Sequence, residues 1–270
     1  MITGASGFIG GHLLKSFLQH GHNAKGLAYN KVDAGLLRMD LTRINRDLLA
    51  SMLHGCDTLV HSAGGYDKTL NITGTRNLLD VCAEAGVKRF IFLSSFDAIN
   101  EDSAYASSKR QAEQLVMGYS FQHCIIRPSQ VYGEGDHNIF ALGRMIYKWP
   151  IVFIPGNGEY KRRPLYVSDL CRKIISLKED YDMPGEYNMV GPEIVTIMEI
   201  VHSLEMQLER NPFHLKIPAV AIKALVQITE RARGISEGLC DKCVVPDGVE
   251  AKYGSTSLQV GLAEICKAIR

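Results

Sequence analysis

The sequence predicts an α/β fold in which a doubly wound parallel sheet is followed by a smaller C-terminal domain. Three observations predict it: a glycine-rich turn near the start, alternating strand-like and helix-like segments in the first half, and a change of composition after residue 130. Such alternation is typical of a parallel sheet with helices on both faces. A chain of 270 residues can form one large domain or two unequal ones. We expect a first domain over residues 1–130, to which 160–180 return, and a second over 131–270.

The first motif is the glycine-rich segment 3–10, TGASGFIG. Gly4, Gly7 and Gly10 allow a tight turn, a close approach to a ligand and close packing of the next helix. The residues that follow place apolar side chains at helical spacing: Ile9, Leu13, Leu14, Phe17 and Leu18. A glycine-rich turn that leads into a helix N-terminus binds anions, because free N–H groups and the helix dipole point at the ligand. The segment therefore predicts a phosphate-binding loop.

The strand before this loop is unusually short. Only Met1 and Ile2 precede Thr3, whereas a mean strand has about five or six residues. Two explanations remain open. The natural start lies upstream of Met1, which we favour, or the sheet tolerates a very short strand at its centre.

Strands and helices alternate through the next hundred residues. We expect strands at 24–29, 36–41, 58–63, 87–93 and 123–128, and helices at 45–53, at 71–86 and from 105 onward. The strand at 58–63 runs into Gly64-Gly65, a second turn of small residues. A ligand that lies across the carboxyl edge of a parallel sheet requires such turns at the strand ends. The proline at position 128 ends the regular alternation.

Beyond Val131 the composition changes. Glycines, prolines and basic residues become dense, which predicts a loop-rich region that binds the substrate. Helical patterns return at 168–177, 198–208 and 219–232.

The charge, the apolar runs and the cysteines of the sequence bear on which partners and which cellular compartment we expect. Lys and Arg number 30 against 29 Asp and Glu, a formal charge of +1, so no overall field favours nucleic acid or an anionic membrane. The longest apolar run near the C-terminus, 217–228, is too short to span a bilayer. Seven scattered cysteines indicate reduced thiols in the cytoplasm. Cys240 and Cys243 form a lone Cys-x-x-Cys, and because a structural zinc site needs four ligands, we expect no metal.

Taken together, the motifs resemble the extended short-chain dehydrogenase/reductases, and in particular their NAD-dependent epimerase/dehydratase branch. The resemblance covers nearly the whole chain. It depends on the glycine loop and on these segments in order: Asp40-Leu41, VHSA at 60–63, 71–79, Tyr105 with Lys109, Arg127-Pro128, VYG at 131–133, YVSD at 166–169 and GEYN at 185–188.

The resemblance implies a Rossmann-type first domain, a substrate-binding C-terminal domain and a nicotinamide dinucleotide, NAD or NADP. The glycine loop would hold the pyrophosphate, Asp40 would contact the adenine, and Tyr105 and Lys109 would lie beside the nicotinamide ribose. The expected cofactor-binding residues are Gly4, Gly7, Phe8, Ile9, Gly10, Asn30, Asp40, Leu41, Ala63, Gly64, Tyr105 and Lys109.

Tyr105 and Lys109 are spaced i, i+4, so both project from one face of a helix. A tyrosine titrates near pH ~10, and lowering a pKa by one corresponds to about 1.4 kcal/mol, so a phenolate base near neutrality needs roughly 3–4 kcal/mol of stabilisation. A lysine ammonium one turn away favours the phenolate. By resemblance Ser95 orients the substrate oxygen, with Ser94 the weaker candidate. Ten positions separate Ser95 from Tyr105, fewer than is usual in the branch, which predicts a more open substrate pocket.

Two further places in the sequence bear on the choice of cofactor and substrate. The end of the second strand carries Tyr29, Asn30 and Lys31 instead of the acidic residue that accepts from the ribose 2′-hydroxyl of NAD. The sequence therefore does not clearly indicate NAD or NADP, although Lys31 slightly favours NADP. Arg162 falls where sugar-nucleotide members of the family place an arginine on the substrate diphosphate, a role that suits its bidentate geometry.

The sequence predicts an enzyme, an NAD(P)-dependent oxidoreductase or epimerase/dehydratase acting on a hydroxyl or keto carbon of a small molecule, with a nucleotide sugar as one candidate. Tyr105 would move the proton. The alternative is a non-catalytic dinucleotide-binding protein, either a redox sensor or an accessory subunit of a respiratory complex. By resemblance the chain would form a homodimer through helices at 71–86 and 105–118, with Leu115 and Met117 in the interface. No nucleic acid or integral membrane contact is expected.

Overall fold

The computed structural model describes the whole chain except residues 30–34, 180–183, 223–239, 243–244 and 246–248. The described residues divide into two compact units. The first holds residues 1–128, 167–189 and 250–252, and the second holds 129–166, 190–249 and 253–270. The segment that returns to the first unit is thus 167–189, where the sequence pattern led us to expect 160–180.

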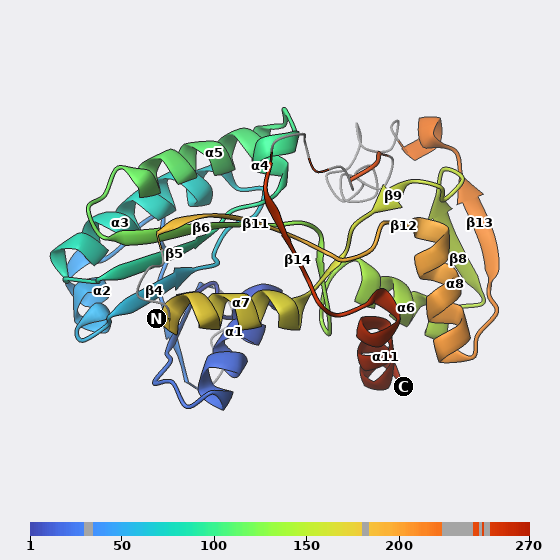
Figure 1. Ribbon diagram of the computed structural model, residues 1–270, viewed down its shortest axis with the longest axis horizontal. Coiled ribbons are helices and arrows are strands. Elements are labelled where there is room, and N and C mark those ends of the chain that lie inside the picture. Colours follow the sequence, from blue (N-terminus) through green and yellow to red (C-terminus); the bar gives the residue numbers. More distant parts are fainter. Residues whose placement is uncertain (30–34, 180–183, 223–239, 243–244, 246–248) are drawn as a thin grey trace. The chain divides into compact units, whose positions relative to one another are not determined.

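An eight-stranded sheet forms the centre of the first unit (Figure 1). Its order is β14-β11-β6-β5-β4-β1-β2-β3, and the pairings from β3 to β11 are all parallel. The strands are β1 (Ile2–Thr3), β2 (Gly26–Ala28), β3 (Leu36–Arg38), β4 (Thr58–His61), β5 (Arg89–Leu93), β6 (Gln122–Pro128), β11 (Gly185–Val190) and β14 (Ala251–Tyr253). The predicted doubly wound parallel sheet is confirmed.

Helices cover both faces of this sheet, with α2, α3 and α5 on one face and α1 and α7 on the other (Figure 1). They are α1 (Phe8–Gln19), α2 (Arg46–Leu53), the π-helical turn η1 (Leu70–Gly74) that leads into α3 (Thr75–Glu84), α4 (Asp97–Asn100), α5 (Ala104–Met117) and α7 (Val167–Glu179). Side-chain caps fix two of the starts: Asn45 accepts from the Leu48 amide at 3.0 Å, and Ser103 accepts from the Ala106 amide at 3.1 Å.

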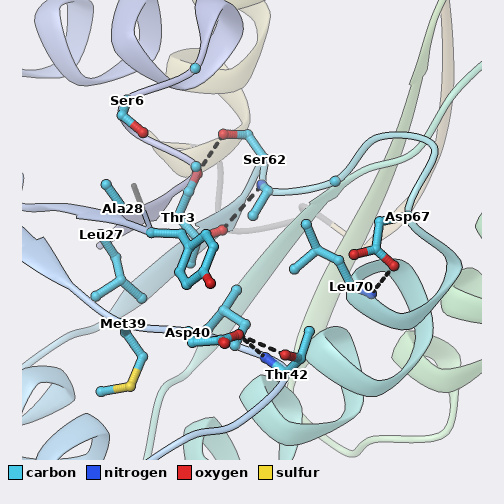
Figure 2. A pocket seen from close by; sticks show the side chains of 16 residues that line it. Thr3, Ser6, Leu27, Ala28, Met39, Asp40, Thr42, Ser62, Asp67 and Leu70 are labelled. Carbon is cyan, nitrogen blue, oxygen red and sulfur yellow. Dashed lines mark hydrogen bonds between the residues drawn. The ribbon is translucent and has the colours of Figure 1, made fainter. Parts of the chain in front are cut away.

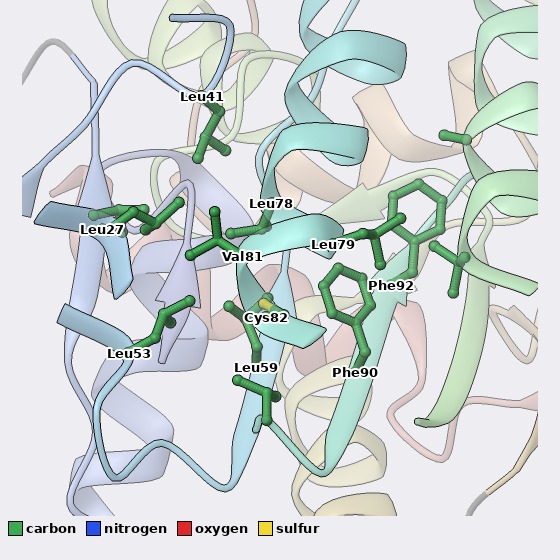
Figure 3. Close-up of a cluster of buried hydrophobic side chains, with 14 of the residues drawn as sticks. Leu27, Leu41, Leu53, Leu59, Leu78, Leu79, Val81, Cys82, Phe90 and Phe92 are labelled. Atoms are coloured by element: carbon green, nitrogen blue, oxygen red, sulfur yellow. The ribbon is translucent and has the colours of Figure 1, made fainter. Parts of the chain in front are cut away.

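The core of the first unit lies between α3 and the sheet. Leu78, Leu79, Val81 and Cys82 of α3 belong to one buried cluster with Leu59 of β4 and with Phe90 and Phe92 of β5 (Figure 3). All seven side chains are at most 1 % exposed. The apolar spacing on 71–86 in the sequence therefore marks the face of the helix that packs on the sheet.

The described part of the second unit contains three two-stranded sheets and three complete helices, and residues 219–222 are helical as well. β7 (Val131–Tyr132) pairs with β10 (Leu165–Tyr166), β8 (Ile151–Pro155) with β13 (Phe213–Ile217), and β9 (Lys161–Arg162) with β12 (Val195–Thr196). The helices are α6 (Ile139–Lys148), α8 (Ile197–Leu208) and α11 (Leu258–Ile269), which share one apolar core. The region expected to be rich in loops thus holds regular elements, α6 and α11 among them, that the sequence pattern did not predict.

Part of the helix predicted at 219–232 falls on residues 223–232, which lie outside the described residues. Within the described part of the chain, no helix is long and apolar enough to cross a bilayer.

Candidate active site

A pocket opens at the carboxyl ends of β1, β2, β3 and β4, where the first glycine loop meets the loop after β4 (Figure 2). Six residues that the sequence assigned to the cofactor line this pocket: Gly4, Gly7, Asp40, Leu41, Ala63 and Gly64. Phe8, Ile9 and Gly10 form the first turn of α1. Asn30 and Lys31 lie outside the described residues.

The glycine loop is shaped by two close backbone approaches. Gly4 has a φ of +68°, and a Cβ there would lie 2.7 Å from the Ala63 nitrogen. A Cβ at Gly10 would lie 2.2 Å from the Gly4 carbonyl oxygen. Both positions therefore exclude any side chain. α1 has no acidic residue in its first turn, so its N-terminal amides favour an anion, as a pyrophosphate site requires.

Polar side chains of the motifs at 3–10 and 60–63, for which the sequence indicated no role, fix the loop after β4. The Ser62 hydroxyl donates to the Thr3 carbonyl at 2.6 Å, and the Ala63 amide donates to Thr3 Oγ1 at 3.3 Å (Figure 2). Thr3 Oγ1 also lies 2.6 Å from His61 Nδ1, and His61 Nε2 lies 3.0 Å from Thr75 Oγ1. His61 is completely buried, and burial lowers its pKa to about 3, so the imidazole is neutral.

Asp40 is held at the opposite edge of the pocket by Thr42. The Thr42 hydroxyl and amide donate to Asp40 Oδ1 at 2.7 and 2.8 Å (Figure 2). These bonds, the hydroxyl foremost, lower the pKa of Asp40, so the carboxylate is ionised at neutral pH. Asn77 Nδ2 donates to the neighbouring Leu41 carbonyl at 2.9 Å and fixes the same turn. The Asp-x-Thr spacing is the sequence signal that would have identified Thr42.

Tyr105 and Lys109 lie in the first unit on α5, as predicted. Lys109 is 4 % exposed, and its Nζ donates to the Leu93 carbonyl at 3.1 Å at the end of β5. A Cβ at Gly64 would lie 2.8 Å from this nitrogen, so the ammonium packs against the loop that lines the pocket. Burial lowers the pKa of Lys109 to about 8, and Glu113 opposes that shift, so the ammonium stays mostly protonated at pH 7.

The two serines at the end of β5 differ in their surroundings. Ser95 is half-buried, and its Oγ accepts from the Asp97 amide at 3.2 Å, at the start of α4. Ser94 is buried, and among the described residues its hydroxyl has no hydrogen-bond partner. Ser95 therefore caps a turn, while its hydroxyl hydrogen can still point elsewhere.

Arg162 belongs to β9 in the second unit and is 4 % exposed. Its Nη1 donates to the Lys161 carbonyl at 2.8 Å and also to the carbonyl of Cys240. The guanidinium thus binds main-chain oxygens, which no sequence motif indicated. Cys243, the second cysteine of the lone Cys-x-x-Cys, lies outside the described residues. The described part of the chain shows no group of three or more His, Cys, Asp or Glu side chains arranged for a metal.

Comparison with known proteins decides the family. The sequence pattern of the NAD dependent epimerase/dehydratase family matches residues 1–190. The chain belongs to this family. The resemblance to the extended short-chain dehydrogenase/reductases is thereby confirmed. All residues that line the pocket described above lie within the region that the family pattern matches.

Individual relatives are distant. The chain is 27 % identical to a 3-beta-hydroxysteroid dehydrogenase of Mycolicibacterium neoaurum over 68 % of its own length and 62 % of that protein. It is 28 % identical to a ceramide reductase of Caulobacter vibrioides over 65 % of its length and 59 % of the relative. The chain therefore spans about three fifths of the length of these two relatives.

Solved structures share the fold over the whole chain. UDP-glucose 4-epimerase of Thermus thermophilus, crystallised in complex with NAD, superposes with a TM-score of 0.77 at 18 % identity and covers 99 % of this chain and 97 % of its own. At that identity the likeness shows the fold alone.

Proposed function

We propose that this chain is an NAD(H)-dependent oxidoreductase or epimerase that acts on a secondary alcohol or ketone. The observation that carries the proposal is the placement of Lys109, one helical turn from Tyr105 and packed against the pocket loop at Gly64. A surface Tyr/Lys pair would not bury its ammonium. NAD, when bound, supplies the hydride acceptor or donor.

The residues present fit such a cofactor. The side-chain-free backbone at Gly4 and Gly10, with the anion-binding start of α1, suits a pyrophosphate. We assign Asp40 to the adenine, and Ala63 and Gly64 to the adenosine ribose and phosphates. NAD is preferred over NADP because the family is NAD dependent. Tyr29, which is exposed and lines the pocket, stands where an acidic residue would have marked that preference.

In this mechanism Tyr105 takes the proton from the substrate hydroxyl, or returns it to the ketone oxygen. The Lys109 ammonium favours the phenolate form of Tyr105 electrostatically. Ser95 hydrogen-bonds the substrate oxygen and holds the reacting carbon in place. A reductase would release its product after one transfer, whereas an epimerase would return the hydride to the same substrate.

A nucleotide-linked sugar is the first substrate class to test, with Arg162 as the candidate contact for its diphosphate. A planar guanidinium suits this role because it can donate two parallel hydrogen bonds to a phosphate. We expect Arg162→Leu to raise KM for UDP-glucose and to leave the NADH affinity unchanged.

Two further assignments belong to the same proposal. A homodimer would form through α3 and α5, where Met117 is 44 % exposed and Leu115 packs partly into the core of its own subunit. Light scattering that shows a monomer at micromolar concentration would contradict it. A cytoplasmic location is supported by the thiols of Cys56, Cys82, Cys124, Cys171 and Cys266, none of which forms a disulfide within the described residues.

The deciding experiment is calorimetric binding of NAD(H) and NADP(H) to the wild type and to Tyr105→Phe, paired with hydride exchange from labelled cofactor into sugar nucleotides, hydroxysteroids and small ketones. Exchange that is lost in Tyr105→Phe, with cofactor binding retained, supports the proposal. Tight binding without exchange on any substrate would instead favour a non-catalytic dinucleotide-binding protein.

A further inference from the structure

Tyr66, in the loop after β4, packs its ring against Tyr105. The two ring centres are 5.2 Å apart, and the planes meet at 47°. Tyr66 is 63 % exposed although it is a large aromatic residue. An exposed aromatic ring beside the acid/base group offers an apolar surface that a bound substrate would cover, because ligand sites are lined mainly by apolar and aromatic side chains.

A hydrogen-bonded clamp fixes the backbone next to this ring. Asn71 Nδ2 donates to the Gly65 carbonyl at 2.7 Å and to Ser108 Oγ at 2.9 Å. The Ser108 hydroxyl in turn donates to the main-chain carbonyl of Tyr105 at 2.7 Å. Asn71 and Ser108 are both 1 % exposed, so breaking these bonds would leave buried polar groups unpaired. The clamp therefore ties the loop that carries Tyr66 to the helix that carries Tyr105.

The other side of Tyr66 is anchored as well. Asp67 Oδ1 accepts from the amides of Thr69 and Leu70 at 2.8 and 3.3 Å, and so fixes the turn that leads into η1. Tyr66 thus stands between two fixed neighbours, Gly65 and Asp67. The backbone that carries the exposed ring is therefore anchored on both sides, which reduces the cost of ordering this wall when a ligand binds.

The segment between Ser95 and Tyr105 is short, with only nine residues. A short segment there predicts an open substrate pocket, in which the exposed ring of Tyr66 is accessible beside Tyr105. We propose that Tyr66 is a specificity-determining residue that contacts the substrate and forms the wall of the reaction site beside Tyr105. The ligand it fits is a saturated ring that carries a secondary alcohol, because the C–H face of such a ring packs on an aromatic face. This inference rests on the proposed function.

The test uses the full chain loaded with NAD, and titrates UDP-glucose and, separately, a 3β-hydroxysteroid by calorimetry. The variants are Tyr66→Ala, Tyr66→Phe and the control Leu48→Ala, which truncates another exposed apolar side chain of the first unit. We expect Tyr66→Ala to weaken binding of one probe about tenfold, or ~1.4 kcal/mol. Tyr66→Phe and Leu48→Ala should bind that probe like the wild type, and the NADH affinity should be unchanged in all three.

Equal probe affinity in the wild type and Tyr66→Ala would overturn the inference, and so would the absence of binding by either probe to the NAD-loaded wild type. A loss of NADH affinity in Tyr66→Ala would also overturn it, because Tyr66 would then belong to the cofactor site. The proposed function would fail in a different way. If a probe binds and Tyr66→Ala weakens that binding, but no hydride is exchanged with the probe, the proposed reaction is contradicted while the role of Tyr66 in substrate binding is supported.

Discussion

The side-chain nitrogen of Lys109 lies so close to Gly64 that a Cβ there would stand only 2.8 Å from it. The same nitrogen donates to the Leu93 carbonyl at 3.1 Å and lies 5.2 Å from the ring centre of Phe92. The Lys109 side-chain nitrogen, carried by α5, thus contacts both the loop after β4 and the end of β5. The missing side chain at Gly64 is what leaves room for the ammonium.

Gly64→Ala should therefore displace the ammonium without unfolding the protein, since the nearest obstacle is the end of a flexible side chain. We expect the NADH affinity to fall about tenfold, or ~1.4 kcal/mol, in a fluorescence titration. Gly118→Ala is the matched control, because a Cβ there meets only ordinary contacts, the nearest at 3.4 Å. Unchanged NADH binding in Gly64→Ala would show that the lysine does not serve the cofactor.

Lys109→Met should abolish hydride transfer while making the cofactor-free protein more stable. Burial lowers the pKa of Lys109 to about 8 from 10.5, so at pH 7 the folded state carries a charge that the interior disfavours. Removing it should raise the free energy of unfolding by the order of 1 kcal/mol, after the lost hydrogen bond to Leu93 is counted.

The pH dependence of that gain provides a control. Between pH 8 and 10.5 the unfolded chain binds the lysine proton more tightly than the folded one, so wild-type stability rises with pH in this window relative to Lys109→Met. Urea unfolding of both proteins at pH 7 and pH 10 measures it. A constant difference between the two would contradict the assignment.

His61 predicts a loss of stability in mild acid. Its pKa is about 3 in the folded state against 6.5 in the unfolded state, so below pH 6.5 only the unfolded chain takes up the proton. The stabilisation is fully present above pH 6.5 and falls by up to about 1.4 kcal/mol per pH unit as the pH drops toward 3.

Replacing His61 with glutamine should remove this dependence. Between pH 7.5 and 5.5 the wild type should lose about 1 kcal/mol more of its unfolding free energy than His61→Gln. Chemical denaturation at the two pH values measures the difference, and equal losses would mean that His61 titrates normally in the fold.

Arg127 offers a pair of matched substitutions. Its Nε and Nη2 donate to the two carboxylate oxygens of Glu113 at 2.8 and 2.7 Å, and its Nη1 lies 2.6 Å from Glu186. The Glu113 side chain is 5 % exposed, whereas that of Glu186 is 48 % exposed.

Glu113→Gln should therefore cost about 3 kcal/mol of unfolding free energy, because it leaves a buried guanidinium without its bidentate partner. Glu186→Gln removes the same charge at an exposed site and should cost less than about 1 kcal/mol. Thermal or urea unfolding compares the two. Equal costs would indicate that the geometry around Glu113 adds nothing to the pair.

Much of the first unit was predictable because local pattern and tertiary packing agree there. The apolar spacing at 71–86 marks the face of α3 that packs on the sheet, and the run at 58–63 contains the buried strand β4. The region after Val131 was not predictable in the same way. The strands of the second unit have two to five residues, and each is stable only because a partner from a distant segment pairs with it, as β8 does with β13.

The residues of the candidate site likewise divide into those that the sequence indicated and those that it did not. The glycine loop, Asp40 and the Tyr105/Lys109 pair are visible in the sequence because each is a motif of fixed spacing. The roles of the residues that hold them were not visible in the same way. Ser62 and Asn71 lie in the motif segments, but they act through bonds to partners 59 and 37 positions away. Thr42 was missed although its partner Asp40 is only two positions away.

The family, the parallel sheet and the motifs that would hold a dinucleotide follow from the amino-acid sequence alone, since these depend on short-range spacing and on hydrophobic period. Three features became visible only in the folded chain: Lys109 is buried against Gly64, Tyr66 packs on Tyr105, and Arg162 binds main-chain carbonyls. The physical reason is that burial and hydrogen-bond partnership are properties of the folded assembly. They arise where segments distant in the sequence meet, and no local window of sequence contains them.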